Sequence, residues 1–331
     1  MKRRGRLRSA FGRHLIGGLV ALTGILGLDS CDDPTGPLRD SRGVLLVVRG
    51  GFGPGAEIYA MRPDGSEMRR LTTNTLFDTD PAWSPDGNRI AFVSTPDSLP
   101  GAPGRKPDIF VMNEDGSEAS RLFQSSLAAW HPRWSPDGRR IAFENYDPAV
   151  SGFRVYVMDA DGSNVRQIPS AAGENFSPEW SPDGTRILFL SNRPPRNWWT
   201  MYIVNADGTG ERQLSDDSVC FHNIFAIRWS PDGSRIAYTC ESEGGSIYSV
   251  RPDATDRRLL IAHPGDNPSQ DFGPVWSPDG GQLAFTSNRD SPGAPHPPRL
   301  HVFVASAAGG SVTRITSDSA GYVVADWGPP R

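Results

Sequence analysis

The chain has 331 residues and a formal net charge of −4, and its 37% hydrophobic residues are enough for a buried core, which excludes a disordered polymer. Its 36 glycines and 30 prolines make it rich in turns, which favours an all-β fold with many short strands. The sequence holds no helical heptads, so a coiled coil is excluded as well.

Residues 1–30 have the pattern of an export signal and are set aside from the fold. The basic residues that open this segment are Lys2, Arg3, Arg4, Arg6, Arg8 and Arg13. Residues 15–28 then run without a charge for 14 positions, fewer than the ~20 that a membrane-spanning helix needs. The segment ends in Leu28-Asp29-Ser30-Cys31, which resembles the lipobox of bacterial lipoproteins.

The lipobox resemblance implies cleavage before Cys31 and a lipid on its thiol. The protein would then be exported, periplasmic or at the cell surface, and held to a bacterial membrane only through the lipid, with inner or outer membrane left open. An ordinary secretory signal followed by a chance cysteine is the alternative. We interpret residues 31–43 as a flexible tether.

Removal of residues 1–30 makes the remaining chain strongly acidic. That segment holds six basic residues and one acidic residue, so 28 basic and 37 acidic residues remain, with a net charge of −9. Without a basic stripe to neutralise phosphates, a nucleic-acid partner is excluded.

The rest of the chain is built from one repeat. The sequence Trp-Ser-Pro-Asp-Gly occurs five times, and a sixth tryptophan, Trp327, follows; the five copies start at Trp83, Trp134, Trp180, Trp229 and Trp276. Each unit of 46–51 residues reads as a tryptophan-bearing strand, a tight turn and three further short strands. Four antiparallel strands repeated at this period predict a β-propeller.

The two ends of the repeat region are incomplete in complementary ways. Residues 44–49 match the second strand of a unit and lack a tryptophan strand before them, whereas the chain stops soon after the tryptophan strand at Trp327. Pairing of these two strands would complete a sixth blade and close the ring. We therefore predict a six-bladed propeller over residues 44–331.

The repeated pattern WSPDG-x-x-IAF…IYVM-x-x-DG…R-x-LT is similar to the PD40 (WD40-like) repeats of the TolB propeller family, and it covers residues 44–327. The resemblance implies a monomeric protein of the bacterial envelope that engages a protein or a peptidoglycan-associated partner. The protein that gives the family its name carries an α/β domain before its propeller, whereas only the short tether precedes the first strand here, so the role of that domain is not implied for this chain.

Motifs of catalysis and cofactor binding are missing from the sequence: Gly-x-Ser-x-Gly, HExxH, a P-loop and a dinucleotide-binding glycine pattern. We therefore assign no catalytic residue, cofactor or metal ligand, and expect a non-catalytic binding or scaffold protein. The alternative is a carbohydrate-active enzyme resembling a polysaccharide lyase, with a metal in the central channel. A purely structural subunit is a third hypothesis.

The loops between blades vary in sequence and should surround one mouth of the channel. Their acidic, amide and imidazole side chains are the predicted binding face: Asp78, Asp80, His131, Glu174, Asn175, His222, Asn223 and Asp271. Such a set could hold a cation, a peptide or a sugar.

Two cysteines remain after Cys31. A mirror count about the turn at residues 230–233 places Cys240 opposite about residue 223, so Cys220 lies near it without facing it directly. A disulfide and a pair of free thiols both remain open.

Overall fold

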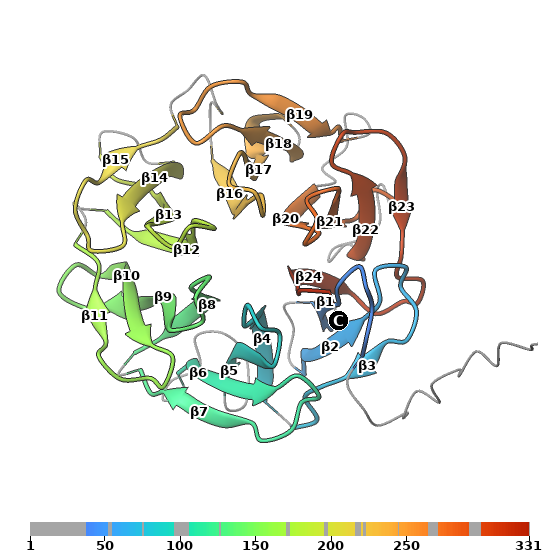
Figure 1. The fold of residues 1–331 in the computed structure, drawn as a ribbon, viewed down its shortest axis with the longest axis horizontal. Coiled ribbons are helices and arrows are strands. Elements are labelled where there is room, and N and C mark those ends of the chain that lie inside the picture. Colours follow the sequence, from blue (N-terminus) through green and yellow to red (C-terminus); the bar gives the residue numbers. More distant parts are fainter. Residues whose placement is uncertain are drawn as a thin grey trace, which may run out of the picture. The chain divides into compact units, whose positions relative to one another are not determined.

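The computed structural model describes residues 38–51, 55–74, 76–95, 106–125, 127–169, 173–194, 198–215, 220, 223–243, 245–263, 271–290 and 299–330. These residues form 24 strands and one short 3-10 helix, η1 (Glu241–Glu243). The strands make six four-stranded antiparallel sheets arranged around an axis, with one strand of each sheet nearest the centre (Figure 1). The predicted six-bladed β-propeller is confirmed.

The blades are numbered here in chain order, and their strands are given from the axis outward. Blade 1 is β24 (Tyr322–Trp327), β1 (Leu45–Arg49), β2 (Glu57–Met61) and β3 (Arg69–Arg70). Blade 2 is β4 (Phe77–Trp83), β5 (Arg89–Thr95), β6 (Asp108–Asn113) and β7 (Ser120–Phe123). Blade 3 is β8 (Ala129–Trp134), β9 (Arg140–Asp147), β10 (Gly152–Asp159) and β11 (Arg166–Gln167).

Blade 4 is β12 (Asn175–Trp180), β13 (Arg186–Ser191), β14 (Thr200–Asn205) and β15 (Arg212–Gln213). Blade 5 is β16 (Ile224–Trp229), β17 (Ile236–Cys240), β18 (Ser246–Val250) and β19 (Arg258–Ile261). Blade 6 is β20 (Asp271–Trp276), β21 (Gln282–Ser287), β22 (His301–Ser306) and β23 (Val312–Arg314).

Blade 1 joins the two ends of the propeller, as the incomplete repeats predict. β24 pairs antiparallel with β1, in a register that sets Trp327 opposite Leu45 and Tyr322 opposite Arg49. Backbone hydrogen bonding continues past the strand, where the N–H of Gly328 donates to Val44 O at 2.9 Å. The ring therefore closes through pairing of the last strand with the first.

The Ser-Pro-Asp-Gly segments form the turns that the sequence predicts. In the first copy, Gly87 N donates to Ser84 O at 2.7 Å, and the φ of 65° at Gly87 explains the glycine. The aspartate side chain is bound within its own turn, since Asp86 accepts from Ser84 Oγ at 2.6 Å and from Asn88 N at 3.0 Å. The equivalent bonds lower the pKa of Asp183 to about 2. These aspartates therefore hold turns together.

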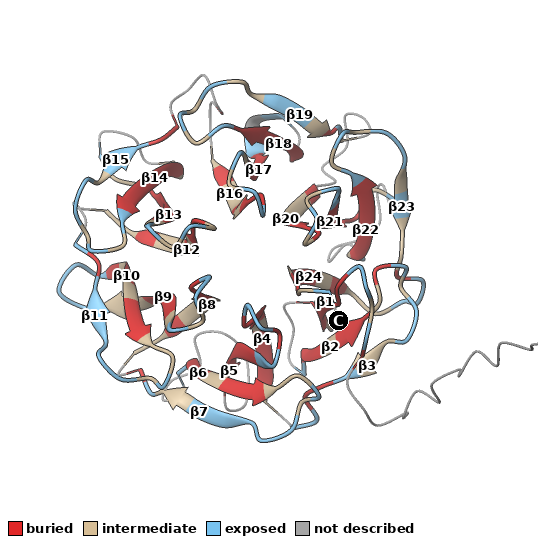
Figure 2. Ribbon diagram, viewed as in Figure 1, coloured by how far each residue is buried: buried red, intermediate tan, exposed pale blue. Residues whose placement is uncertain are grey.

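Neighbouring blades pack through the repeated tryptophans, and the exposed residues lie in the turns and on the outermost strands (Figure 2). The six tryptophans of the repeat are 5–9% exposed. An arginine that opens the second strand of the preceding blade lies over the ring at three of the interfaces: Arg89 over Trp134, Arg140 over Trp180, and Arg186 over Trp229, at 4.6–5.6 Å. Such cation–π contacts add about 0.5–1 kcal/mol each at exposed sites.

Residues 38–43, which the sequence assigns to the tether, lie on the propeller. Leu38 is 7% exposed and joins the core between blades 1 and 2. The indole N–H of Trp327 donates to Arg42 O at 2.8 Å, and the side chain of Arg42 pairs with Asp40 at 2.9 Å. The part of the predicted tether that the structure describes is therefore a packed arm. Residues 1–37, with the predicted export signal and Cys31, lie outside the described residues.

Candidate functional site

The strand nearest the axis carries a β-bulge in every blade, shortly before its tryptophan. In blades 2–6, two residues of this strand oppose one residue of the next strand. The first bulge residue has a positive φ in each case: Asp80, His131, Ser177 and Ala226 at 48–53°, and Gly273 at 66°. A non-glycine residue pays about 1–2 kcal/mol for this conformation, and such strain tends to collect at functional sites.

The bulges surround a cavity of about 490 Å³ in the central channel. All six innermost strands contribute to its wall, together with the end of β17 and the turn after it. The volume falls within the ~300–1,000 Å³ typical of small-ligand pockets. The cavity can therefore take a short segment or a small molecule, and it is too small for a folded domain.

The wall of the cavity has an aromatic part and a charged part. Phe176, Phe225 and Phe272 lie on the consecutive blades 4, 5 and 6, each directly before the bulge residue and each half-buried. Asp80 and His131 line the cavity on blades 2 and 3. A ligand would therefore meet both apolar surface and charged groups within one cavity.

His131 is held between two carboxylates. Its Nδ1 lies 2.9 Å from Glu144 Oε1 and its Nε2 lies 3.6 Å from Asp80 Oδ2. The other oxygen of Glu144 accepts a hydrogen bond from Ser177 N at 2.9 Å, which ties blade 3 to blade 4. Burial disfavours the imidazolium, but the charges of Asp80 and Glu144 together outweigh burial and raise the pKa of His131 to about 9. The side chain is therefore a cation at neutral pH.

Two arginines that line the cavity, Arg133 and Arg228, form a second charged group with Glu179. Arg133 Nε lies 3.3 Å from Glu179 Oε2, and Arg228 Nη1 lies 3.8 Å from the same oxygen. Burial and the nearby charge of Arg133 lower the pKa of Arg228, while burial raises the pKa of Glu179 against the pull of both arginines. Arg228 also donates to Ala325 O on β24 at 3.3 Å, so a blade 5 side chain reaches blade 1 past blade 6.

Three residues of the predicted binding face lie outside the cavity lining. Asp78, Asn175 and Asp271 are fully buried near the starts of their strands. Asp78 accepts from Ser94 Oγ at 2.5 Å, Asn175 accepts from Arg193 at 3.1 Å, and Asp271 pairs with Arg289. Each one anchors the start of an innermost strand to its own blade.

Glu174 and Asn223 also lie outside the cavity lining. Glu174 accepts from Asn192 Nδ2 at 3.1 Å in blade 4. Asn223 accepts from Trp199 N at 2.9 Å and donates to Glu241 Oε2 at 2.6 Å, and Glu241 does line the cavity. His222 lies outside the described residues. Of the eight predicted residues, Asp80 and His131 are the two that the structure brings together in the cavity.

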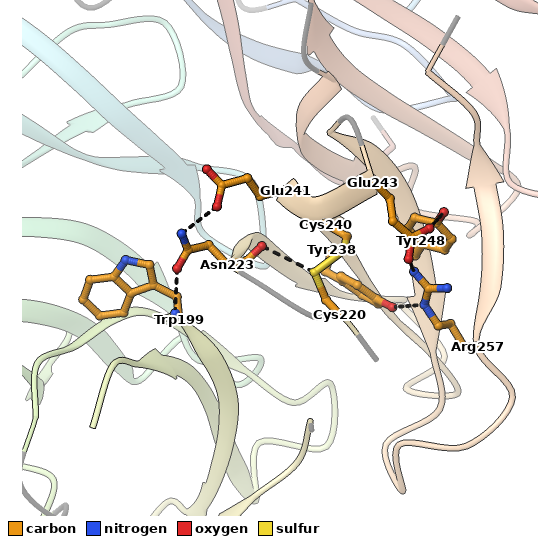
Figure 3. The surroundings of a disulfide bond; sticks show 9 residues. All are labelled: Trp199, Cys220, Asn223, Tyr238, Cys240, Glu241, Glu243, Tyr248 and Arg257. Carbon is orange, nitrogen blue, oxygen red and sulfur yellow. Dashed lines mark hydrogen bonds and ion pairs between the residues drawn. A yellow bond between two sulfur atoms is a disulfide. The ribbon is translucent and has the colours of Figure 1, made fainter. Parts of the chain in front are cut away.

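Blade 5 carries a disulfide next to this region (Figure 3). Cys220 is bonded to Cys240, with Cα atoms 5.8 Å apart. The pairing partner of Cys240 in the sheet is Ile224, close to the position that the mirror count predicts. The bond therefore fixes the approach to β16, and Glu241 follows directly after Cys240.

Four charged residues of this region are not among those predicted from the sequence: Arg133, Glu179, Arg228 and Glu144. The first three directly precede the repeat tryptophans, in the segments His-Pro-Arg-Trp, Ser-Pro-Glu-Trp and Ala-Ile-Arg-Trp. In blades 2 and 6 the residue before the tryptophan is Ala82 or Val275. A comparison of the repeats at this position could therefore have found the charged residues. Glu144 gave a similar signal, because the second strands of blades 2 and 4 have Val93 and Leu190 at the equivalent position.

Across the described ranges, the structure holds no group of three or more His, Cys, Asp or Glu side chains arranged to bind a metal ion. None of the helices within those ranges has the length and apolar character needed to cross a membrane.

Comparison with known families matches almost the whole described chain. The family model PD40, described as the TolB beta propeller domain, matches residues 41–147, 100–253 and 151–330. The chain belongs to the PD40 TolB beta-propeller family. The family resemblance seen in the repeats is thus confirmed.

Curated relatives match this PD40 chain over short segments. It is 34% identical over 79 residues to the Tol-Pal system protein TolB of Alcanivorax borkumensis, a match covering 24% of this chain and 17% of the relative. It is 30% identical over 135 residues to the TolB homolog of Chlorobium luteolum, covering 30% of each. Across four such relatives, the matches span 12–33% of the relatives' own lengths.

Solved structures share the PD40 propeller fold. TolB from Acinetobacter baumannii superposes with a TM-score of 0.68 at 17% identity, covering 89% of this chain and 69% of that one. The putative TolB from Agrobacterium tumefaciens gives 0.63 at 19% identity, covering 84% and 90%. An oligogalacturonate lyase from Vibrio parahaemolyticus gives 0.55 at 16% identity, covering 76% and 72%. At these identities the likeness concerns the fold alone.

Proposed function

We propose that this chain is a non-catalytic binding protein of the bacterial cell envelope, which takes a segment of a protein or peptidoglycan-associated partner into the central cavity. The observation that carries the proposal is the amphipathic cavity. Its aromatic wall suits an apolar side chain, and its charged wall suits a polar or ionic group. Strained bulge residues hold that wall in place, as expected for a preorganised site.

The envelope location is supported by three independent features. The first 30 residues have the pattern of an export signal, and Cys31 occupies the lipid-attachment position of a lipobox. A disulfide between Cys220 and Cys240 suits an oxidising compartment outside the cytoplasm. Two relatives are named as TolB, one of them as a Tol-Pal system protein. We propose a monomer anchored through the lipid, without a cofactor.

The test is partner capture with a variant of the cavity wall. The double variant Phe225→Ala/His131→Gln removes one aromatic and one charged contact, and Leu259→Ala changes a 51% exposed residue on the outer strand β19. Proteins cross-linked from an envelope extract are identified by mass spectrometry. We expect the double variant to recover its partner about tenfold less well, and the β19 variant to match the natural chain. Equal recovery by all three would rule out the cavity as the binding site.

The lyase alternative predicts different measurements. It needs a metal in the channel and turnover of a polymer of uronic acids. Elemental analysis of the purified protein and an absorbance assay for unsaturated uronates separate the two hypotheses. A stoichiometric transition metal together with lyase turnover would replace the binding function proposed here.

A further inference from the structure

The end of the cavity nearer the Ser-Pro-Asp-Gly turns, the inner end, has more arginine N–H donors than acceptors for them. Arg133 and Arg228 both line the cavity and share the single carboxylate of Glu179, at 3.3 and 3.8 Å. Each guanidinium has five N–H donors, so one shared carboxylate and a few backbone carbonyls leave donors unused. For Arg133, the described residues supply Glu179 and Pro132 O as acceptors, which leaves its Nη2 group without one.

The nearby acidic groups are already engaged. Asp326, which precedes the tryptophan of β24, accepts the backbone N–H groups of Trp83 at 2.7 Å and Trp327 at 2.9 Å. Nearer the mouth, Asp80 faces His131 at 3.6 Å, and Glu241 accepts from Asn223 at 2.6 Å. An incoming carboxylate would therefore find unused arginine donors at the inner end. Asp326 accepts hydrogen bonds from backbone N–H groups, while its negative charge and that of Glu179 still act on Arg228.

Along the same strands, the aromatic wall lies closer than the arginines to the mouth of the channel, which is the end surrounded by the loops between blades. Phe225 is three residues before Arg228 on β16, and Phe176 is three residues before Glu179 on β12. A ligand that places a carboxylate on the arginines would thus set the neighbouring part of its chain against the phenylalanines. Arginine binds carboxylates with two parallel hydrogen bonds, which adds orientation as well as affinity.

We infer that the inner end of the cavity binds a carboxylate of the partner segment through Arg133 and Arg228, with an adjacent apolar side chain against Phe176, Phe225 and Phe272. This inference rests on the proposed binding function and names the chemistry of its ligand: an acidic group beside an apolar residue. The carboxylate can come from an aspartate or glutamate side chain or from the C-terminus of a chain.

Matched pairs of small peptides test the inference and separate the two sources. N-acetyl-Leu-Asp-amide is compared with N-acetyl-Leu-Asn-amide, and N-acetyl-phenylalanine is compared with its amide, each titrated into the full-length protein by NMR. We expect at least one acid to bind about tenfold more tightly than its amide. The pair that discriminates identifies the source. Equal affinity within both pairs would overturn the inference.

Variants of the arginines and of their shared partner give opposite expectations. Arg133→Gln and Arg228→Gln should each abolish the preference for the acid. Glu179→Gln should increase acid affinity several-fold, because both guanidinium groups lose their competing carboxylate. Arg139→Gln, on an exposed turn of the same blade as Arg133, is the control and should change nothing. A purely structural role of the three residues predicts loss of binding in all three variants, which would contradict the inference.

Folding and function are checked in the same series. Thermal unfolding identifies any variant that fails to fold, and Arg228→Lys then replaces Arg228→Gln, since lysine keeps the charge but loses the two-bond geometry. If the protein captures a partner but prefers neither acid over its amide, the proposed function is supported and this inference is wrong. Acid binding by a protein that captures no partner would support the carboxylate site and count against the proposed partner function. If oligogalacturonate binds at these arginines and none of the peptides binds, the inference that the ligand is a segment of a protein partner is wrong.

Discussion

His131 is the residue whose charge sets the polarity of the cavity wall. It lies 2.9 Å from Glu144 and 3.6 Å from Asp80, and the two carboxylates keep it protonated against the cost of burial. The same contacts connect three blades, because Asp80 belongs to blade 2 and Glu144 also binds Ser177 of blade 4. The cation is therefore part of both the wall and the packing of the ring.

The pH dependence of stability should report this cation. The pKa of His131 in the folded protein is about 9, above the ordinary 6.5, so its stabilisation is fully present below about pH 6.5 and is lost as the pH rises through about 9. Free energies of unfolding of the natural chain and of His131→Gln should therefore differ most near pH 6 and converge towards pH 10. A difference that stays constant over this range would contradict the pairing.

His301 offers a contrast within the same molecule. Burial and the charge of Arg314 lower the pKa of His301, so its folded state favours the neutral ring. The stability that depends on this group should decrease as the pH falls through the ordinary value of about 6.5. The difference between the natural chain and His301→Gln should therefore change below about pH 6.5, whereas that for His131→Gln should change near pH 9.

The residues of the site were only partly predictable from the sequence. Asp80 and His131 were predicted because polar residues in variable loops are candidates for binding. Asp78, Asn175 and Asp271 have the same chemistry, yet they are buried at strand starts, because the side chains of a strand alternate between two faces. The bulge then shifts that alternation, and its position could not be read from residue types alone.

At the scale of elements, the bulges of the innermost strands store backbone strain that can be measured. Ala226 has a φ of 48° in β16, whereas Ala325 occupies the bulge of β24 and is not among the residues with positive φ. Glycine relieves the strain at Ala226 at the cost of a more flexible unfolded chain.

Chemical denaturation should therefore show opposite effects of the same substitution. Ala226→Gly should raise the free energy of unfolding by up to about 1 kcal/mol, whereas Ala325→Gly should lower it by about 0.5–1 kcal/mol. Because both variants remove one methyl group beside the cavity, the difference between them isolates the backbone conformation. Destabilisation of similar size in both variants would contradict the strained bulge.

The disulfide is the second element whose contribution can be tested. It closes a loop with a sequence separation of 20 residues, which corresponds to roughly 3 kcal/mol in the loop-entropy description. The double variant Cys220→Ala/Cys240→Ala should unfold at a lower temperature than the natural chain and should not respond to dithiothreitol. The natural chain should lose a similar amount of stability on reduction. If reduction leaves its melting unchanged, the bond adds nothing to the fold.

The repeat predicted the position of Cys240 in the sheet to within one residue. A mirror count places it opposite about residue 223, and the structure pairs it with Ile224. The hairpin pairs Trp229 with Ile236 across a turn wider than the count assumes, and the bulge of β16 shifts the register back. Turns and strands thus follow from local sequence, whereas register depends on irregularities with little sequence signal.

At the scale of the whole molecule, the cavity exists only because the ring is closed. β24 supplies Val323, Val324 and Ala325 to its wall and accepts the hydrogen bond of Arg228. Closure could be predicted because two partial repeats, at residues 44–49 and at Trp327, sum to one blade. The packed arm at 38–43 could not be predicted, because its single apolar residue, Leu38, is followed by polar and charged residues and gives no periodic pattern.

Removing the closing strand should therefore unfold the protein. A chain that stops after Gly321 loses the buried side chains of Tyr322, Val324 and Trp327. Losing large buried side chains costs about 2–5 kcal/mol each, and together they approach the whole ~5–15 kcal/mol of a typical domain. Circular dichroism should show no cooperative melting for this truncated chain. Melting near the natural temperature would mean that closure contributes little.

A circular permutant tests the same closure without removing the strand. Trp327 faces Leu45 as Trp83 faces Ile90 in blade 2, where residues 84–89 form the hairpin between them. In the permutant, a copy of residues 84–89 joins Trp327 to Leu45, and the new chain begins at Gly173 and ends at Pro169. Blade 1 then becomes a continuous unit like the others. This chain should still melt cooperatively, because the closing pair becomes a local hairpin and its loop entropy falls, which opposes the loss of the buried side chains of Leu38 and Val44. It should also keep the affinity of the cavity for its ligand. The permutant lacks the arm at 38–43. If it stays unfolded although its hairpin copies a natural turn, strand pairing alone does not hold the ring together and the arm is needed as well.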